Sequence, residues 1–327
     1  MTQTPVFLFC SERSGSNLIS MIAGTHSQFY ALPPFHFGRL ALLNLHETLQ
    51  GGVESPAWQQ ICKRTAARIK TLLGAPEAEA AQAWLTARSR IDAAELARFL
   101  YQDSVPAAAG KRVFVKENNL HRLLFFILAA FPDAKFVFQV RDPRDYLASA
   151  KALRAKEGAN KFGNNRDAVR IWREDQEGGL HALALLGPDR VFLHRYEDLL
   201  TGSEALLQRL CRFLEVDFEP GMLDFHQTEQ AAALATSHKQ RANISKPLMS
   251  GNFAKYRSAL TRKEIRQVEN RLGDLMQLFG YPLDLAAPGK AGRKRDSGLL
   301  GQFDRQPLLA PLNYGPRDPA VPAVADS

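Results

Sequence analysis

The chain has 327 residues, of which 45% are hydrophobic and 23% are charged, a balance that is ordinary for a globular protein and excludes wholesale disorder. Its net charge of +8 suits nucleic acid, an anionic membrane or a small polyanionic ligand equally well. No apolar run is long enough to span a membrane, the first residues lack the basic region and cleavage site expected of a secretory signal, and three cysteines fit neither a disulfide framework nor a zinc site. We therefore expect a cytoplasmic protein without a membrane span.

Four short β-rich runs are separated by helical patterns. They cover residues 6–10, 112–116, 135–141 and 190–196. Each run is almost continuously apolar, β-branched or aromatic, as expected for strands that are buried on both faces of a parallel sheet with right-handed crossovers. The sequence therefore predicts the α/β class, with three layers around a central parallel sheet.

The domain organisation is predicted from changes in pattern. Residues 37–105 have the pattern of a helical insertion between the first two predicted strands, with Ser55 and Pro56 placed as a helix cap and first-turn proline. Proline and glycine recur without periodicity near the C-terminus. We expect one domain over residues 1–283 and an extended or partly disordered tail over residues 284–327.

A short polar loop follows the first predicted strand and precedes a helical pattern. Backbone N–H groups at such a helix start form an anion site. A Walker A loop needs glycine, four residues, and then Gly-Lys-Ser/Thr. Gly15 has the correct offset from Cys10, but Cys10 replaces the first glycine, and Ser16 and Asn17 replace the lysine and the magnesium-binding hydroxyl. The loop, with Arg13 as its cation, predicts phosphate binding without magnesium; an ordinary Ser/Gly turn is the alternative.

A second strand–helix junction follows residues 135–141. Asp142 is placed to cap the helix and Pro143 to occupy its first turn. Ser149 shares a helical face with Asp142, so it points back toward Arg141. Arg141 and Ser149 can then hold one phosphate between them, although a capped helix with surface charges is the alternative. Both junctions open at the carboxyl ends of parallel strands, where such sheets bind ligands.

These segments resemble the sulfotransferases that use 3′-phosphoadenylyl sulfate (PAPS), especially their bacterial and carbohydrate branch. SERSGSNL (11–18) resembles the family's 5′-phosphosulfate loop, and VRDPRDYLAS (140–149) resembles its 3′-phosphate motif. HRYEDLL (194–200) resembles a further family segment, and SKPLMSGNFAKYRSAL (245–260) is similar to the loop that folds over the nucleotide. The four motifs occur in the family's order between about residue 6 and residue 281, which makes the resemblance specific.

The resemblance implies a P-loop-like, nucleotide-kinase-like sulfotransferase fold with PAPS as co-substrate and no metal. Tyr196 would pack on adenine, Lys246 would lie near a phosphate, and Arg13 and Lys116 would supply cations for an in-line displacement at sulfur. The implied nucleotide-binding residues are Arg13, Ser14, Gly15, Ser16, Asn17, Arg141, Ser149, Tyr196 and Lys246.

The general base departs from the family pattern. Cytosolic relatives place a histidine two residues after the Lys116 position, where this chain has Asn118, and other branches place a glutamate near Pro33. His36, just beyond that stretch, and Glu117, directly after Lys116, are the two candidates. The sequence does not decide between them.

Two other functions compete with sulfuryl transfer to a hydroxyl. One is a P-loop kinase acting on a small molecule, which the absent Gly-Lys-Ser/Thr signature disfavours. The other is a catalytically silent nucleotide-binding protein, which the displaced base keeps open. We expect a small-molecule or carbohydrate acceptor rather than nucleic acid, while its identity and the oligomeric state are not predicted.

Overall fold

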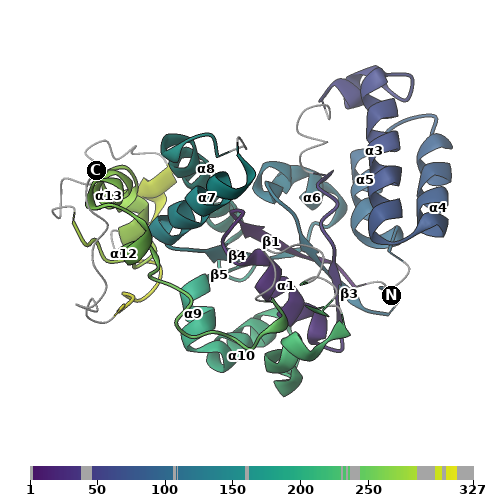
Figure 1. Cartoon of the computed structure of the whole chain (residues 1–327). Helices are drawn as coiled ribbons and strands as arrows, with labels where there is room; N and C mark the ends of the chain where they lie inside the picture. The colour runs from purple at the N-terminus through teal and green to yellow at the C-terminus, as the bar shows by residue number, and fades with distance from the viewer. Residues whose placement is uncertain are drawn as a thin grey trace.

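The computed structural model is built around a parallel sheet of five strands in the order β2-β3-β1-β4-β5 (Figure 1). It describes residues 3–37, 46–105, 108, 110–158, 162–229, 231–232, 235, 244–285, 299–303 and 307–314. The strands are β1 (Val6–Cys10), β2 (Phe29–Leu32), β3 (Arg112–Lys116), β4 (Lys135–Val140) and β5 (Val191–Arg195).

The four predicted strands are present, but a fifth, β2, was not predicted. Only four residues long, β2 lies at the edge of the sheet and pairs with β3, so its short pattern lacked the length of the others. Its presence places the helical insertion between β2 and β3 rather than between the first two strands. Two of the predicted strands also extend one residue too far at their C-terminal ends. Arg141 lies between β4 and the next helix, and Tyr196 begins a helix after β5.

Helices cover both faces of the sheet. The α-helices include α1 (Ser16–Thr25), α3 (Pro56–Leu72), α4 (Ala75–Thr86), α5 (Ala93–Arg98), α6 (Leu124–Ala130), α7 (Pro143–Glu157), α8 (Asn165–Leu186), α9 (Tyr196–Thr201), α10 (Ser203–Leu214), α12 (Tyr256–Ala259) and α13 (Arg262–Leu278). Short 3₁₀ or π turns are η1 (Phe99–Asp103), η3 (Leu120–Leu123), η4 (Pro220–Gln227) and η6 (Leu299–Gln302).

Alternate side chains of β1 belong to two different hydrophobic cores, one on each face of the sheet. Phe7 and Phe9 belong to the core that includes α7, α8 and α13, whereas Val6 and Leu8 belong to the core that includes α1 and α10. Figure 1 shows α7 and α8 on one side of the sheet and α1, α9 and α10 on the other. This three-layer arrangement, with parallel strands buried on both faces, confirms the predicted α/β class.

The helical insertion forms a lobe beside the sheet (Figure 1). Its helix α3 begins where the sequence predicts, because the Ser55 side chain accepts the Trp58 N–H and Pro56 fills the first turn. The insertion returns to the sheet through Tyr101, whose ring meets Phe7 of β1 edge-on at 5.4 Å between centroids. The lobe is therefore joined to the central strand by aromatic packing.

Part of the predicted tail packs against the domain. Between residues 307 and 314, Leu308 N–H donates to the Leu278 carbonyl at 2.7 Å and Leu312 N–H to the Gly280 carbonyl at 2.8 Å. The Arg195 guanidinium donates to the Ala310 carbonyl at 2.7 Å. This segment is extended and tied to the end of α13. Among the described residues, no helix has the length and apolarity required to cross a membrane.

Candidate functional site

A pocket of about 440 Å³ lies at the carboxyl ends of β1, β4 and β5. Its wall combines the loop after β1, the start of α7, the start of α9, η4 and the segment 244–259. Of the nine predicted nucleotide-binding residues, eight line this pocket: Arg13, Gly15, Ser16, Asn17, Arg141, Ser149, Tyr196 and Lys246. The ninth, Ser14, has a fully buried side chain whose Oγ has no hydrogen-bond partner among the described residues.

The loop after β1 is held from two directions. Gln139 of β4 donates through Nε2 to the Ser14 carbonyl at 2.6 Å, and Gln176 of α8 donates to the Ser11 hydroxyl at 2.8 Å. Gly15 has φ +83° immediately before α1 begins. A Cβ at Gly15 would stand 2.3 Å from Cδ2 of Tyr196. This position therefore requires glycine for both its backbone conformation and its close approach to the Tyr196 ring.

The two predicted anion-binding motifs meet directly. Arg141 donates through Nη1 to the Arg13 carbonyl at 2.7 Å, and Arg13 donates through Nε to the Ser149 hydroxyl at 3.1 Å. The predicted cap is present, since the Asp142 carboxylate accepts the Arg144 N–H at 2.7 Å. Two guanidinium groups, one hydroxyl and the first turn of α1 therefore line one pocket, which suits an anionic ligand.

Tyr196 forms part of the pocket wall and is only 5% exposed. The Arg141 guanidinium lies 4.8 Å from the centre of its ring, and Asn252 donates to its hydroxyl at 2.8 Å. Burial raises the pKa of Tyr196, so the hydroxyl is neutral at pH 7. The ring packs against Gly15 and Arg141, which leaves it little open surface for the adenine stacking that the resemblance implies.

An acidic residue that was not predicted as part of the site also lines the pocket. Asp145 lies 4.0 Å from the Arg141 guanidinium and accepts the Tyr256 N–H at 2.8 Å. Burial raises its pKa, while the nearby Arg141 charge acts in the opposite direction. Asp145 thus fastens the segment before α12, which carries Asn252 and Lys255 of the pocket wall, to α7. Only the fold reveals this contact, because Asp145 and Tyr256 are 111 residues apart.

A buried ionic cluster supports the junction from behind. Arg144 is fully buried and pairs with Asp142 at 2.7 Å and with Glu269 at 2.8 Å. The Asp142 N–H donates to Glu197 at 3.0 Å, and the Tyr281 hydroxyl donates to the same carboxyl group at 2.9 Å. Burial and the neighbouring Asp142 charge raise the pKa of Glu197 to about 8. These groups fix the α7 start beneath Arg141.

The predicted catalytic residues other than Arg13 lie outside the wall of this pocket. Lys116 ends β3 and is 7% exposed. Glu117 is 1% exposed; its carboxylate accepts the Phe37 N–H at 2.8 Å and the Tyr101 hydroxyl at 3.2 Å. His36 is half-buried and has φ +57°. Glu117 therefore holds the backbone directly after His36, and that loop has the strained geometry often found at functional sites.

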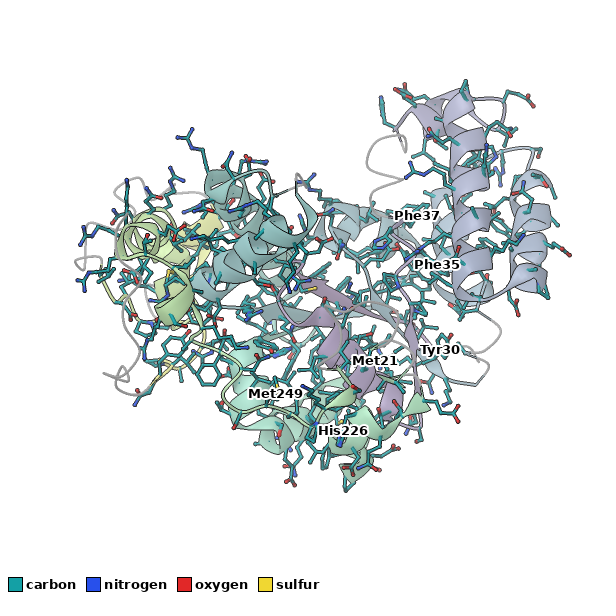
Figure 2. All side chains as sticks on the ribbon, viewed as in Figure 1. Met21, Tyr30, Phe35, Phe37, His226 and Met249 are labelled. Carbon is teal, nitrogen blue, oxygen red and sulfur yellow. The ribbon has the colours of Figure 1, made fainter. Side chains whose placement is uncertain are left out.

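Buried aromatic side chains flank the His36 loop. Phe35 and Phe37 are 3% and 1% exposed, and Figure 2 shows them between the sheet and the helical insertion. Directly after Glu117 in the chain, Asn118 donates through Nδ2 to the Glu12 carboxylate, joining the loops after β3 and β1. Local sequence motifs do not reveal this pairing of Asn118 with Glu12, because the contact spans 106 residues.

A comparison with known protein families agrees with the anion-binding geometry of the pocket. The family model described as "Sulfotransferase family" matches residues 5–220. The chain belongs to the sulfotransferase family. The matched range includes three of the four motifs on which the predicted resemblance rests, and it confirms that resemblance.

Solved sulfotransferase domains share the fold of this sulfotransferase. The domain from the curacin biosynthetic pathway superposes with a TM-score of 0.57 at 22% identity, covering 84% of this chain and 99% of that one. The domain from the Synechococcus PCC 7002 olefin synthase gives 0.55 at 22% identity, covering 82% and 97%. These likenesses confirm the P-loop-like sulfotransferase fold that the sequence predicts.

Two curated relatives match at lower coverage. A protein-tyrosine sulfotransferase of Drosophila melanogaster is 21% identical over 159 residues, or 48% of this chain and 32% of the relative. An uncharacterized protein of Aquifex aeolicus is 22% identical over 246 residues, or 74% and 29%. This sulfotransferase therefore spans about a third of the length of the curated relatives it matches.

Proposed function

We propose that this sulfotransferase moves a sulfuryl group from PAPS to a hydroxyl group of a small-molecule or carbohydrate acceptor, without a metal ion. The observation that carries the proposal is the direct contact of two separate anion motifs, Arg141 with Arg13 and Arg13 with Ser149, in one pocket. PAPS has two separated anionic ends, a 5′-phosphosulfate and a 3′-phosphate, and so needs two such motifs.

The residues of the pocket fit this co-substrate. Its volume of about 440 Å³ lies in the range of small-molecule sites. Among the described residues, four cationic side chains line it, those of Arg13, Arg141, Lys246 and Lys255, against one carboxylate, that of Asp145. The excess of positive charge favours a polyanionic ligand.

We assign roles by position in the pocket. Arg141 and Ser149 would hold the 3′-phosphate, and the loop residues 13–17 would hold the 5′ end at the start of α1. Lys246, which also lines the pocket, would contact a phosphate. When bound, PAPS supplies the sulfuryl group and leaves as 3′-phosphoadenosine 5′-phosphate (PAP).

The catalytic groups would come from the loop after β1 and from the end of the neighbouring strand β3. Arg13 and Lys116 would stabilise charge that develops during transfer, and Glu117 would position the His36 loop through its bond to Phe37 N–H. An acceptor hydroxyl also needs a base. Phenols belong among the acceptors to test, because one relative is named a protein-tyrosine sulfotransferase.

Sulfuryl transfer can be tested with ³⁵S-labelled PAPS and a panel of alcohols, sugars and phenols. The proposal predicts labelled product that forms equally well with and without EDTA. In parallel, γ-³²P-labelled ATP with magnesium should give no labelled product. Phosphoryl transfer from ATP would support a kinase instead, and tight PAP binding without transfer across the panel would support a silent nucleotide-binding protein.

A further inference from the structure

The loop after β1 carries two adjacent charged residues that face different surroundings. Arg13 lines the nucleotide pocket and donates to Ser149 at 3.1 Å. Glu12 is not among the residues that line this pocket, and its carboxylate accepts a hydrogen bond from Nδ2 of Asn118, just beyond β3. Glu12 therefore lies on the β3 side of the loop, next to the residue proposed to stabilise the transferring group.

Two residues that interact with Glu12 carry a buried polar atom. Asn118 donates a hydrogen bond to the Glu12 carboxylate, and Tyr146 lies within range of its charge. The hydroxyl of Tyr146 and Oδ1 of Asn118 are both buried and have no hydrogen-bond partner within the described ranges. Since Oδ1 of Asn118 belongs to the amide that bonds Glu12, it can also bond a polar ligand that approaches this carboxylate. The surroundings of Glu12 thus suit a hydroxyl group better than an apolar one.

The two base candidates from the sequence fit less well. Glu117 is 1% exposed and already accepts hydrogen bonds from Phe37 N–H and the Tyr101 hydroxyl, so taking a proton would disturb both. His36 follows β2, and β3 separates β2 from β1 in the sheet. Glu12, in contrast, is the direct chain neighbour of Arg13.

We propose that Glu12, held by Asn118, is the general base that receives the proton of the acceptor hydroxyl. This inference rests on the proposed function. As the acceptor oxygen forms its bond to sulfur, its proton passes to the Glu12 carboxylate. The bond between sulfur and the bridging oxygen breaks, and its electron pair stays on the 5′-phosphate of PAP. Glu12 then returns the proton to solvent.

Rates can test this role without knowledge of the natural acceptor. Single-turnover release of sulfate from ³⁵S-labelled PAPS uses water as the acceptor, and a series of phenols varies the acidity of the hydroxyl. Glu12→Gln should slow transfer to water and to weakly acidic phenols by about 10²–10⁴-fold, the usual contribution of a general base. The loss should shrink for the most acidic phenols, which need little help to lose a proton.

Three controls separate a base from a structural role. Glu12→Asp keeps a carboxylate and should recover part of the rate. The affinity for PAP, measured by calorimetry, should match wild type in Glu12→Gln, because Glu12 does not line the nucleotide pocket. Glu79→Gln, which changes an exposed glutamate on α4, should leave both the rate and the affinity unchanged.

The contact itself can be tested without any ligand. In a ¹H–¹⁵N spectrum, the side-chain amide signal of Asn118 is identified by its loss in Asn118→Ala. This signal should move in Glu12→Gln and stay in place in Glu79→Gln. An unmoved signal in Glu12→Gln would overturn the pairing of Asn118 with Glu12.

The outcomes distinguish this inference from the proposed function. If wild type transfers sulfuryl groups and Glu12→Gln matches its rates, or if the loss is equal for all phenols, Glu12 is not the base. If only His36→Ala or Glu117→Gln causes the loss, the base lies on one of those residues. If wild type shows neither sulfate release nor transfer, the proposed function itself fails.

Discussion

At the scale of single residues, Gly15 is where backbone conformation and the pocket meet. Its φ of +83° disfavours a side chain, and an added Cβ would stand 2.3 Å from the Tyr196 ring. Gly52 offers a matched control, since its φ is +66° but nothing lies within 4 Å of the added Cβ. Gly52→Ala should cost about 1–2 kcal/mol in free energy of unfolding from conformation alone.

Gly15→Ala should cost more than Gly52→Ala, because the Tyr196 ring must also move. The Arg141 guanidinium lies over that ring, so movement of the ring should displace it. We therefore expect Gly15→Ala to weaken PAP binding at least tenfold, while Gly52→Ala leaves binding unchanged. Chemical denaturation and calorimetry measure the two effects. Equal affinities in the two variants would show that the packing of Gly15 on Tyr196 does not shape the pocket.

The two proposed catalytic cations give a second prediction at this scale. Arg13→Ala and Lys116→Ala should each lower kcat by about 10²–10³-fold, as the loss of one preorganised charge stabiliser typically does. PAP affinity should fall less, because the pocket keeps its other cations. A variant with unchanged kcat would remove that residue from the proposed mechanism.

The residues that the sequence could predict are those carried by local motifs. Arg13, Arg141 and Ser149 belong to two short motifs, and the structure brings them into contact. The sequence could not predict the roles of Asp145, Asn252 and Glu12, because these depend on partners 111, 56 and 106 residues away. No local periodicity encodes contacts at that separation.

At the scale of elements, the segment 307–314 joins the C-terminal part of the chain to the junction beneath the pocket. The Tyr314 hydroxyl donates to the Asp142 carboxylate, which also caps α7 and pairs with Arg144. The Tyr314 ring lies 5.8 Å from that of Phe253, the neighbour of Asn252 in the pocket wall. The segment therefore stabilises the start of α7 and the pocket wall together (yellow in Figure 1).

Tyr314→Phe tests this role. Removing the hydroxyl leaves a buried carboxylate with one donor fewer, so the free energy of unfolding should fall by about 1–3 kcal/mol. Tyr30→Phe, at a half-buried tyrosine of the edge strand β2, should change it by less than about 0.5 kcal/mol. Urea denaturation compares the two variants, and equal stabilities would exclude a stabilising bond from Tyr314 to Asp142.

Helices and strands could be predicted where they have clear capping residues or long apolar runs. The helix α3 begins at the predicted Ser55 cap, and the parallel strands buried on both faces follow their apolar runs. The edge strand β2 has only four residues, too few to show a pattern. The packing of residues 307–314 depends on the end of α13 and on Arg195, so the composition of the tail could not predict it.

At the scale of the whole molecule, three buried groups make the stability of the fold depend on pH in opposite directions. Burial lowers the pKa values of His121 and His194 from 6.5 to about 4, so the unfolded chain binds more protons between these values and stability rises with pH there. Burial raises the pKa of Glu197 from 4.5 to about 8. The folded protein then holds the extra proton, and stability falls as pH rises between these values.

Below about pH 6.5, the rise in stability with pH that the two histidines cause exceeds the fall that Glu197 causes. Above about pH 6.5, only the fall caused by Glu197 remains. We therefore expect the free energy of unfolding to be greatest near pH 6.5 and to fall toward pH 8. Glu197→Gln should flatten the fall between pH 6.5 and 8, measured by urea denaturation at several pH values. A fall that is as steep in Glu197→Gln as in wild type would assign the effect to other groups.

The proposed function requires one pocket to hold both anionic ends of PAPS, and calorimetry of PAP and ADP with wild type and Ser149→Ala tests this requirement most directly. ADP shares the adenosine and the 5′-phosphate of PAP but carries its second phosphate on that 5′ end instead of at the 3′ position. Wild type should bind PAP at least tenfold more tightly than ADP, and Ser149→Ala should weaken PAP while leaving ADP unchanged. Equal affinities of wild type for the two nucleotides, or an equal loss of both in Ser149→Ala, would contradict the proposed 3′-phosphate site.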